Sequence, residues 1–124
     1  MALVHHELCF GCGGANLFGV MLELERSGPD ALAGRCFIKQ DHQGPEPGTA
    51  HEGVIAAALS DAIALACGHD ARVTGIQVRF VAGAPVGGFL DIEAHARPPR
   101  ASASAEGRAV ASASATVAAR APRG

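Results

Sequence analysis

The stretch from Thr49 to Gly68, TAHEGVIAAALSDAIALACG, limits the possible folds more than any other part of the chain. Thr49 and Glu52 have the spacing of a capping box, in which the threonine hydroxyl accepts from the Glu52 amide and the glutamate side chain accepts from the Thr49 amide. Gly68 stands where a helix commonly ends. Because alanine dominates the stretch and no proline interrupts it, the sequence predicts one long helix.

Almost every side of this helix is apolar or small. At about 100° per residue, one broad arc carries the larger apolar side chains, namely Val54, Ile55, Ala58, Leu59, Ala62, Ile63 and Leu65. The opposite side carries small ones, namely Ala56, Ala57, Ser60, Ala64 and Cys67. A helix without a polar face is buried on all sides. Asp61 is the only charged residue in the helix body, and a buried carboxylate requires a partner or a chemical role.

The rest of the chain is predicted to be mostly strands. Alternating apolar and polar residues indicate four of them, at 19–26, 31–40, 72–84 and 89–97. The first two form a hairpin around a turn at 27–30. Alanine alternating with small residues indicates two more strands, at 101–106 and 108–120, although alanine is a poor strand former. The remaining segments are irregular: 1–18 as loop or short helix, 41–48 as loop, and 121–124 as a frayed tail.

Two strands, one helix and about four further strands predict an α+β domain, in which a five- or six-stranded antiparallel sheet wraps around the helix. The 124 residues suffice for a single domain spanning 1–124. Because one sheet covers only one side of a helix, the small side of this helix needs another cover. A second copy of the chain is the simplest cover, so we expect a homodimer.

Charge and composition exclude several classes of function. A net charge of −2 and an aromatic content of 4 % provide neither the basic surface nor the stacking side chains of a nucleic-acid-binding protein. No apolar run approaches the ~20 residues that span a bilayer. His5 and His6 stand where a signal peptide would be apolar. We therefore expect a cytoplasmic protein without a membrane partner.

Cys9 and Cys12 form a C-x2-C pair shortly after His5 and His6, a set of residues that can hold Zn²⁺. A single pair without a second one is a weak metal signal, and we expect no metal. Cys67, in the helix, is expected to be a small buried apolar residue. A nucleophilic pair of Cys67 and His51 is excluded within one chain, because 16 helical residues separate them by about 24 Å.

Several phrases occur in an order that resembles the PaaI-like acyl-CoA thioesterases of the hotdog-fold superfamily. They are Cys9-Phe10-Gly11-Cys12-Gly13 with Asn16 and Gly19, then Gln43-Gly44, Gly48 to Ala57, Val73-Thr74 and Val78-Arg79-Phe80. The resemblance covers about residues 8–97. It implies a sheet wrapped around one helix, a homodimer or a homotetramer of paired dimers, and active sites at the subunit interface. It explains both cysteines without a metal, and coenzyme A enters only as part of the substrate.

The resemblance further implies hydrolysis of an acyl-CoA or acyl-carrier thioester at the start of the helix. The backbone amide of Glu52, helped by that of Gly53, would bind the thioester carbonyl, because the first amides of a helix lack intrahelical acceptors. A carboxylate from the partner's helix would activate water or attack directly. That carboxylate usually stands nine residues after His51, where this chain has Ser60; Asp61 is one residue later, about 100° further around the helix.

Asp61 is therefore the expected catalytic base, and its alternative is a structural carboxylate bonded across the dimer or to an arginine. We expect substrate contacts from Gln43, Gly44, His51, Ser60, Asn16 and Arg79. Loop ordering by Gln43 and bracing by Asn16 stay open as alternatives. A non-catalytic module that binds an acyl thioester or a partner protein also stays open, because Ser60 replaces the usual acid. A dehydratase is disfavoured, since the helix lacks an acid-plus-histidine pattern.

Overall fold

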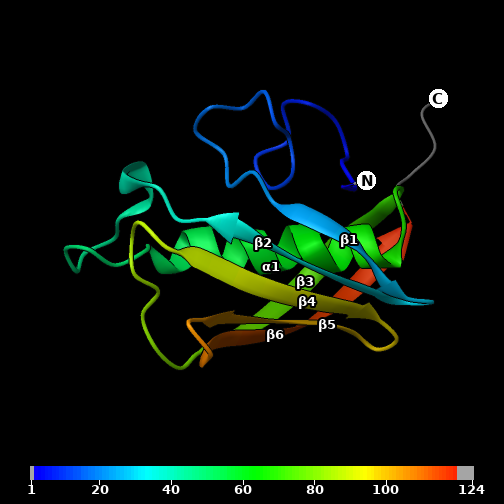
Figure 1. The fold of residues 1–124 in the computed structure, drawn as a ribbon. Coiled ribbons are helices and arrows are strands. Elements are labelled where there is room, and N and C mark those ends of the chain that lie inside the picture. Colours follow the sequence, from blue (N-terminus) through cyan, green and yellow to red (C-terminus); the bar gives the residue numbers. More distant parts are fainter. Residues whose placement is uncertain (1, 120–124) are drawn as a thin grey trace.

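The computed structural model describes residues 2–119, which form one antiparallel sheet and one long helix (Figure 1). The six strands are β1 (Glu23–Gly28), β2 (Ala31–Phe37), β3 (Ala71–Phe80), β4 (Phe89–Ala96), β5 (Pro99–Ala105) and β6 (Arg108–Ala119). They lie side by side in the order β1-β2-β4-β5-β6-β3. Helix α1 spans Glu52–Cys67, and a short 3-10 helix, η1, spans Gln40–His42. The predicted α+β fold, with a sheet around one helix, is confirmed.

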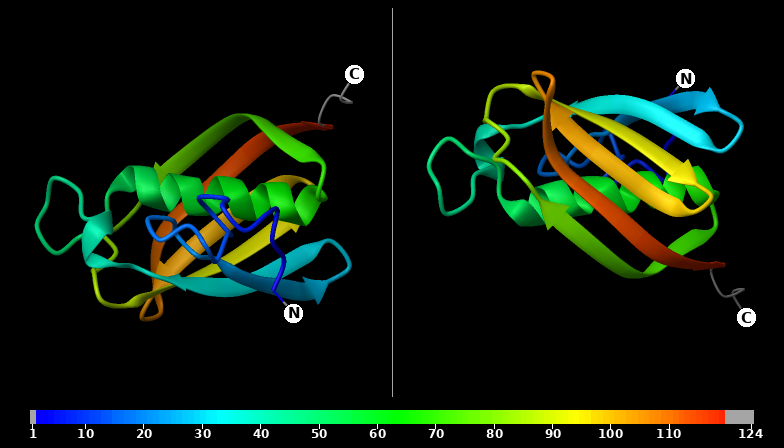
Figure 2. Two further views of the ribbon diagram at one scale, coloured as in Figure 1. Left: turned by 90° about the horizontal axis from the view of Figure 1, so that it is seen from above. Right: turned by 90° about the horizontal axis from the view of Figure 1, so that it is seen from below.

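The sheet curves around α1 and covers one of its sides (Figure 2). The helix residues in this contact include three large side chains and two alanines, all at most 2 % exposed: Ile55, Leu59, Ile63, Ala58 and Ala62. Opposite them, β5 and β6 contribute buried alanines, namely Ala101, Ala103, Ala105, Ala111 and Ala113. These small side chains explain the alanine-rich pattern, because they let the large helix residues fit close to the strands. The prediction that the alanine-rich stretches are strands is confirmed.

Residues 2–22, called here the N-terminal segment, contain no helix or strand and lie over α1 on the side away from the sheet (Figure 2). The amides of Val20 and Leu22 donate to the carbonyls of Phe10 and Gly11, at 2.7 and 2.8 Å. Residues 20–22 therefore pair with their own segment, and β1 begins only at Glu23. The strand predicted at 19–26 starts too early for this reason. The segment covers part of the helix side that we expected a second copy to cover.

The start of α1 differs from the predicted capping box. His51 is the cap, since its Nδ1 accepts a hydrogen bond from the Gly53 amide at 2.8 Å. Thr49 lies in the loop before the helix, where its amide donates to the Glu46 carbonyl and its carbonyl accepts from the Gly44 amide. The Thr49–Glu52 capping box is therefore wrong, because backbone bonds hold Thr49 in the loop and an imidazole nitrogen does the capping.

The end of α1 agrees with the sequence. The helix stops at Cys67, and Gly68 follows with a φ of 131°, a conformation that glycine adopts without strain. Other boundaries shift by a few residues: β2 ends at Phe37 because η1 follows, and β3 ends at Phe80 rather than at 84. The tail predicted at 121–124 lies outside the described residues. Within 2–119, no helix has the length and apolar character needed to cross a membrane.

Candidate functional site

The first turn of α1 presents one unpaired backbone amide. The Gly53 amide is engaged by the His51 imidazole, and the amides of Val54 and Ile55 both donate to the His51 carbonyl, at 2.9 and 3.3 Å. Within the described residues, nothing accepts a hydrogen bond from the Glu52 amide. An unpaired N–H at a helix start adds to the partial positive charge there. The Glu52 amide is therefore a donor available to a carbonyl oxygen.

The loop before the helix is ordered by its own hydrogen bonds. Gln43 accepts from the Gly48 amide at 2.8 Å and donates to the side chain of Gln40 at 3.0 Å. A side chain at Gly44 would overlap the backbone of His51, so only glycine allows this close approach. The Gln43 side chain thus orders the loop, which is one of its two expected roles.

His42 also belongs to this region, although nothing in its irregular sequence context identifies it. The side chain is 2 % exposed, and its Nδ1 accepts from the Lys39 amide at 3.2 Å. Its Nε2 is buried and has no hydrogen-bond partner among the described residues. The His42 carbonyl accepts from the His51 amide at 2.7 Å, so His42 ties the loop to the residue that caps the helix.

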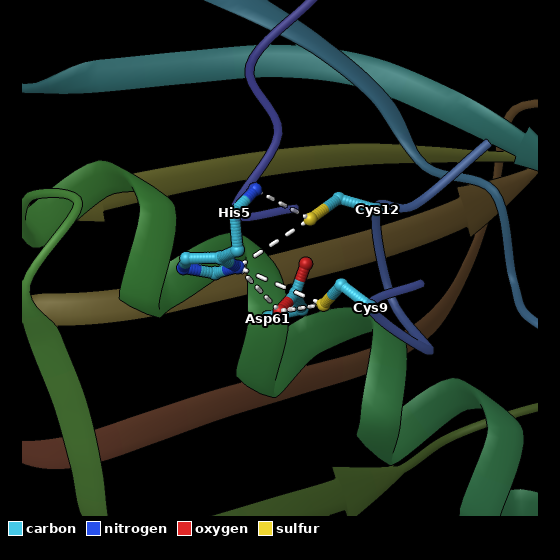
Figure 3. A group of neighbouring side chains, drawn as sticks. All are labelled: His5, Cys9, Cys12 and Asp61. Carbon is cyan, nitrogen blue, oxygen red and sulfur yellow. Dashed lines mark hydrogen bonds and ion pairs between the residues drawn. The ribbon is translucent and has the colours of Figure 1, made fainter. Parts of the chain in front are cut away.

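Two helical turns further on, Asp61 meets the N-terminal segment. Asp61 and Ser60 line a cavity of about 510 Å³ between α1, the N-terminal segment and the start of β3. Figure 3 shows the Asp61 carboxylate among three side chains of the segment. Its Oδ1 lies 3.1 Å from Nδ1 of His5 and 3.5 Å from Sγ of Cys9, while Sγ of Cys12 lies 3.4 Å from the same imidazole nitrogen. Within the described residues of one chain, the partners of Asp61 are thus His5 and Cys9, and no ion pair joins it to an arginine.

This cluster is largely withdrawn from solvent. The side chains of His5 and Asp61 are 10 % and 15 % exposed. Asp61 Oδ2 is buried and has no hydrogen-bond partner among the described residues. Burial, with a smaller contribution from the Asp61 charge, raises the pKa of the Cys12 thiol to about 12, although the His5 amide that donates to its sulfur lowers it. Without a cation nearby, Cys12 is therefore a protonated thiol at neutral pH.

Asn16 and Arg79 lie apart from both features. Asn16 donates to the Leu8 carbonyl at 3.1 Å and accepts from the Phe18 amide at 3.2 Å, so it braces the N-terminal segment. Arg79 lies on β3, with Arg100 and Ser112 around a depression of about 470 Å³. In the strand pairing, Arg79 alternates with Val78, which packs against the core, so Arg79 faces away from α1. Among the described residues, neither Asn16 nor Arg79 has a hydrogen bond or ion pair with Glu52 or Asp61.

The free amide and the carboxylate are too far apart in one chain to act on one bond. Glu52 and Asp61 are nine residues apart on α1, which corresponds to about 14 Å along the helix axis. A carbonyl group held by the Glu52 amide is therefore out of reach of Asp61 of the same chain.

The structure defines the class of fold as the hotdog fold, a six-stranded antiparallel sheet around one long helix. No protein-family model and no curated protein matches the sequence. Solved structures do match, among them PaaI from the phenylacetic acid degradation operon of E. coli, with a TM-score of 0.72 and 13 % identity over 83 % of this chain and 81 % of that one.

Two further matches come from other bacteria. A mutant of the phenylacetic acid degradation protein PaaI from Thermus thermophilus has a TM-score of 0.69 and 24 % identity over 81 % of this chain and 93 % of that one. A proposed thioesterase related to phenylacetic acid degradation, from Ralstonia eutropha, has a TM-score of 0.69 and 19 % identity over 79 % and 84 %. The resemblance to PaaI-like hotdog proteins is thus confirmed at the level of the fold.

Proposed function

We propose that this chain hydrolyses acyl thioesters, with acyl-CoA as the substrate class, at a site shared by two copies. The observation that carries the proposal is the unpaired Glu52 amide at the start of the central helix of a hotdog fold. Such a donor stabilises the negative charge that develops on the carbonyl oxygen when the thioester is attacked. One of the proteins with this fold, the proposed thioesterase from Ralstonia eutropha, supports the same class of reaction.

The proposed reaction uses Asp61 of the second copy as the base. Its carboxylate takes a proton from water, and the water oxygen forms a bond to the carbonyl carbon. The tetrahedral intermediate then breaks its carbon–sulfur bond, which releases the thiolate of coenzyme A and the acid. The proton held by Asp61 returns to the thiolate. Ser60, which lines the same cavity, can hold the water but cannot take its proton.

The free edge of the sheet supports pairing of two copies. β3 is the last strand in the sheet order, and it exposes Ile76 and Phe80 to 40 % and 42 %. A long edge strand with unpaired backbone groups and exposed apolar side chains readily pairs with another strand. We therefore propose a homodimer in which the two sheets join through β3. Its mass in sedimentation equilibrium is the direct check.

The Glu52 amide can be tested by removing only its hydrogen. Glu52 is the first residue of α1 and His51 before it is extended, with a ψ of 137°, so proline fits at this position without breaking the helix. Glu52→Pro should lower kcat/KM for acyl-CoA about 10²–10³-fold, the loss expected for one donor to the oxyanion. Glu52→Ala keeps the amide and should retain most of the activity. Equal activity of the two variants would place the carbonyl elsewhere.

A second function is favoured by the surroundings of Asp61. Its Oδ1 is engaged by His5 and Cys9, and the position before it is Ser60. A carboxylate that is tied up in this way suits a module that binds an acyl thioester without cleaving it. Released thiol over a panel of acyl-CoA substrates, compared between the native chain, Asp61→Asn and Ser60→Ala, separates the two functions. Turnover that Asp61→Asn abolishes supports hydrolysis; saturable binding without turnover supports the module.

A further inference from the structure

His5, Cys9, Cys12 and Asp61 bring together one imidazole, two thiols and one carboxylate (Figure 3). One nitrogen, sulfur or oxygen atom from each of them lies within 4.8 Å of all the others. Three of the residues come from the N-terminal segment, and the fourth comes from the middle of α1. Four good metal ligands are thus gathered in one place.

The separations of these atoms fit a tetrahedral metal ion. Four of the six separations are 3.1 Å for nitrogen to oxygen, 3.5 Å for sulfur to oxygen, and 3.4 and 3.8 Å for sulfur to nitrogen. A tetrahedral Zn²⁺ has bonds of about 2.0–2.3 Å to such ligands, which puts its ligand atoms about 3.3–3.8 Å from one another. Three of the four separations fall in this range, the shortest lies just below it, and the other two are within 4.8 Å, so the cluster is close to the size that zinc requires.

Hydrogen bonds alone could also hold four such side chains together, but two observations favour a cation. Asp61 Oδ2 is buried without a hydrogen-bond partner, and the described ion pairs give Asp61 no lysine or arginine. The His5 amide donates to Sγ of Cys12 at 3.1 Å, a contact that stabilises a thiolate more than a thiol. A buried carboxylate beside a sulfur in an anion-stabilising contact favours positive charge in the cluster, which either a protonated His5 or a bound cation supplies.

We propose that these four residues bind one Zn²⁺ ion per chain. Thiolates and imidazole are the ligands that zinc prefers, and a carboxylate oxygen completes its four-coordinate site. His5 and Asp61 together take the place of the second cysteine pair that the sequence lacks. The cavity of about 510 Å³ beside His5, Cys9 and Asp61 gives an ion a path to the site. This proposal replaces the expectation of a chain without metal.

The zinc ion would fasten the N-terminal segment to the helix. That segment has no regular secondary structure, and Gly11 already lies so close to Asp61 that a Cβ there would overlap the carboxyl group. A metal-bound Asp61 cannot take a proton from water. The metal-loaded protein should therefore cleave thioesters more slowly than the metal-free protein, although the zinc site itself does not depend on the proposed function.

Metal binding is tested without any substrate. The full chain is reduced, stripped with a chelator and titrated with Zn²⁺ against a chromophoric chelator, and we expect one equivalent bound per chain. Titration with Co²⁺ should give the intense visible bands of a tetrahedral ion and a sulfur-to-cobalt charge-transfer band. Less than one equivalent of zinc, or a cobalt spectrum without thiolate bands, would overturn the proposal.

Matched pairs of variants identify the ligands. Cys9→Ala, His5→Ala and Asp61→Asn should each weaken zinc binding by more than the 10–100-fold that loss of a mere outer partner costs. The controls are Cys67→Ala and His6→Ala, which change a cysteine on α1 and the neighbouring histidine, both outside the cluster, and should bind zinc like the native chain. Circular dichroism checks that each variant is folded. Unchanged affinity in folded Cys9→Ala would rule out this site.

The outcome for zinc and the outcome for hydrolysis can be told apart. If zinc binds but neither the metal-free nor the metal-loaded protein releases thiol, the zinc site stands and the proposed hydrolysis fails. If thiol is released and zinc does not bind, the hydrolysis stands and the zinc site fails.

Discussion

The two long sides of α1 are buried by different means. Towards the sheet, large apolar residues such as Leu59 and Ile63 pack against alanines of regular strands. On the other side, an irregular segment touches the helix at Asp61 through Gly11 and the cysteines. The first contact is non-directional and adds stability in proportion to its apolar area. The second contact depends on a few polar atoms in fixed positions. We call this side of α1, which the N-terminal segment covers only in part, the open side. The sheet side therefore sets stability, and the open side is suited to binding and chemistry.

The largest expected effect comes from the sheet side. Leu59→Ala should lower the free energy of unfolding by about 2–5 kcal/mol, because it leaves a cavity where the side chain is fully buried. Its neighbour Ser60 is half-buried on the open side, and Ser60→Ala should change stability by less than about 0.5 kcal/mol. Urea unfolding of both variants measures the contrast. Similar losses in the two would mean that both sides carry stability equally.

The next effect tests the contact on the open side. A Cβ at Gly11 would overlap the Asp61 carboxyl group, whereas one at Gly14 would meet only an oxygen of Glu7, at 3.9 Å. Gly11→Ala should therefore cost about 1–3 kcal/mol by overpacking, and Gly14→Ala should be close to neutral. Hydrogen exchange should show the loss of protection in residues 2–22 and not in the sheet. If Gly11→Ala keeps the segment protected, the segment is not held by its fit to Asp61.

The same contrast explains what could be predicted from the sequence. The sheet side follows from periodicity, because every third or fourth helix residue and every second strand residue must be apolar. The helix body, the hairpin of β1 and β2 and even the alanine-rich β5 and β6 were predictable in this way. Residues 20–22 were wrongly predicted to be part of a strand. Val20 and Leu22 alternate with other residues as in a strand, but their amides donate to carbonyls of the N-terminal segment.

The open side could not be predicted, because it depends on contacts between distant residues. Cys9 and Asp61 are 52 positions apart, and no local sequence pattern predicts that they are in contact. The sequence indicated His5, Cys9 and Cys12 as a weak metal pattern and Asp61 as a carboxylate without an explanation. The metal pattern lacked a fourth ligand, and the carboxylate lacked a partner; their contact in the fold supplies both. The cap of α1 was missed for another reason, because the Thr49–Glu52 spacing does not reveal that backbone bonds to Glu46 and Gly44 hold Thr49 in the loop.

A smaller effect appears at high pH on the sheet side. Burial, and then the nearby Asp91 charge, raise the pKa of the Cys36 thiol from its ordinary 9.0 to about 12. Below pH 9 the thiol is protonated in the folded and the unfolded chain, so its contribution is complete. Between pH 9 and 12 only the unfolded chain loses the proton, and stability falls, by about 1.4 kcal/mol at pH 10.

The matched variant isolates this thiol from the others whose pKa is also raised, Cys12 and Cys67. Cys36→Ala should be less stable than the native chain at pH 8, yet lose about 1.4 kcal/mol less between pH 8 and pH 10. Urea unfolding at the two pH values gives both numbers. Parallel loss in the native chain and the variant would show that Cys36 ionises in the folded protein.

The smallest effect lies at the start of α1. His51→Ala removes the imidazole that accepts from the Gly53 amide, and the lost cap should lower the free energy of unfolding by about 0.5–1 kcal/mol. His51→Asn supplies another capping oxygen and should restore most of it. Because His51→Ala also frees the Gly53 amide next to that of Glu52, kcat/KM for acyl-CoA should not fall in proportion to stability. A large loss of activity in both variants would instead give the imidazole itself a part in the reaction.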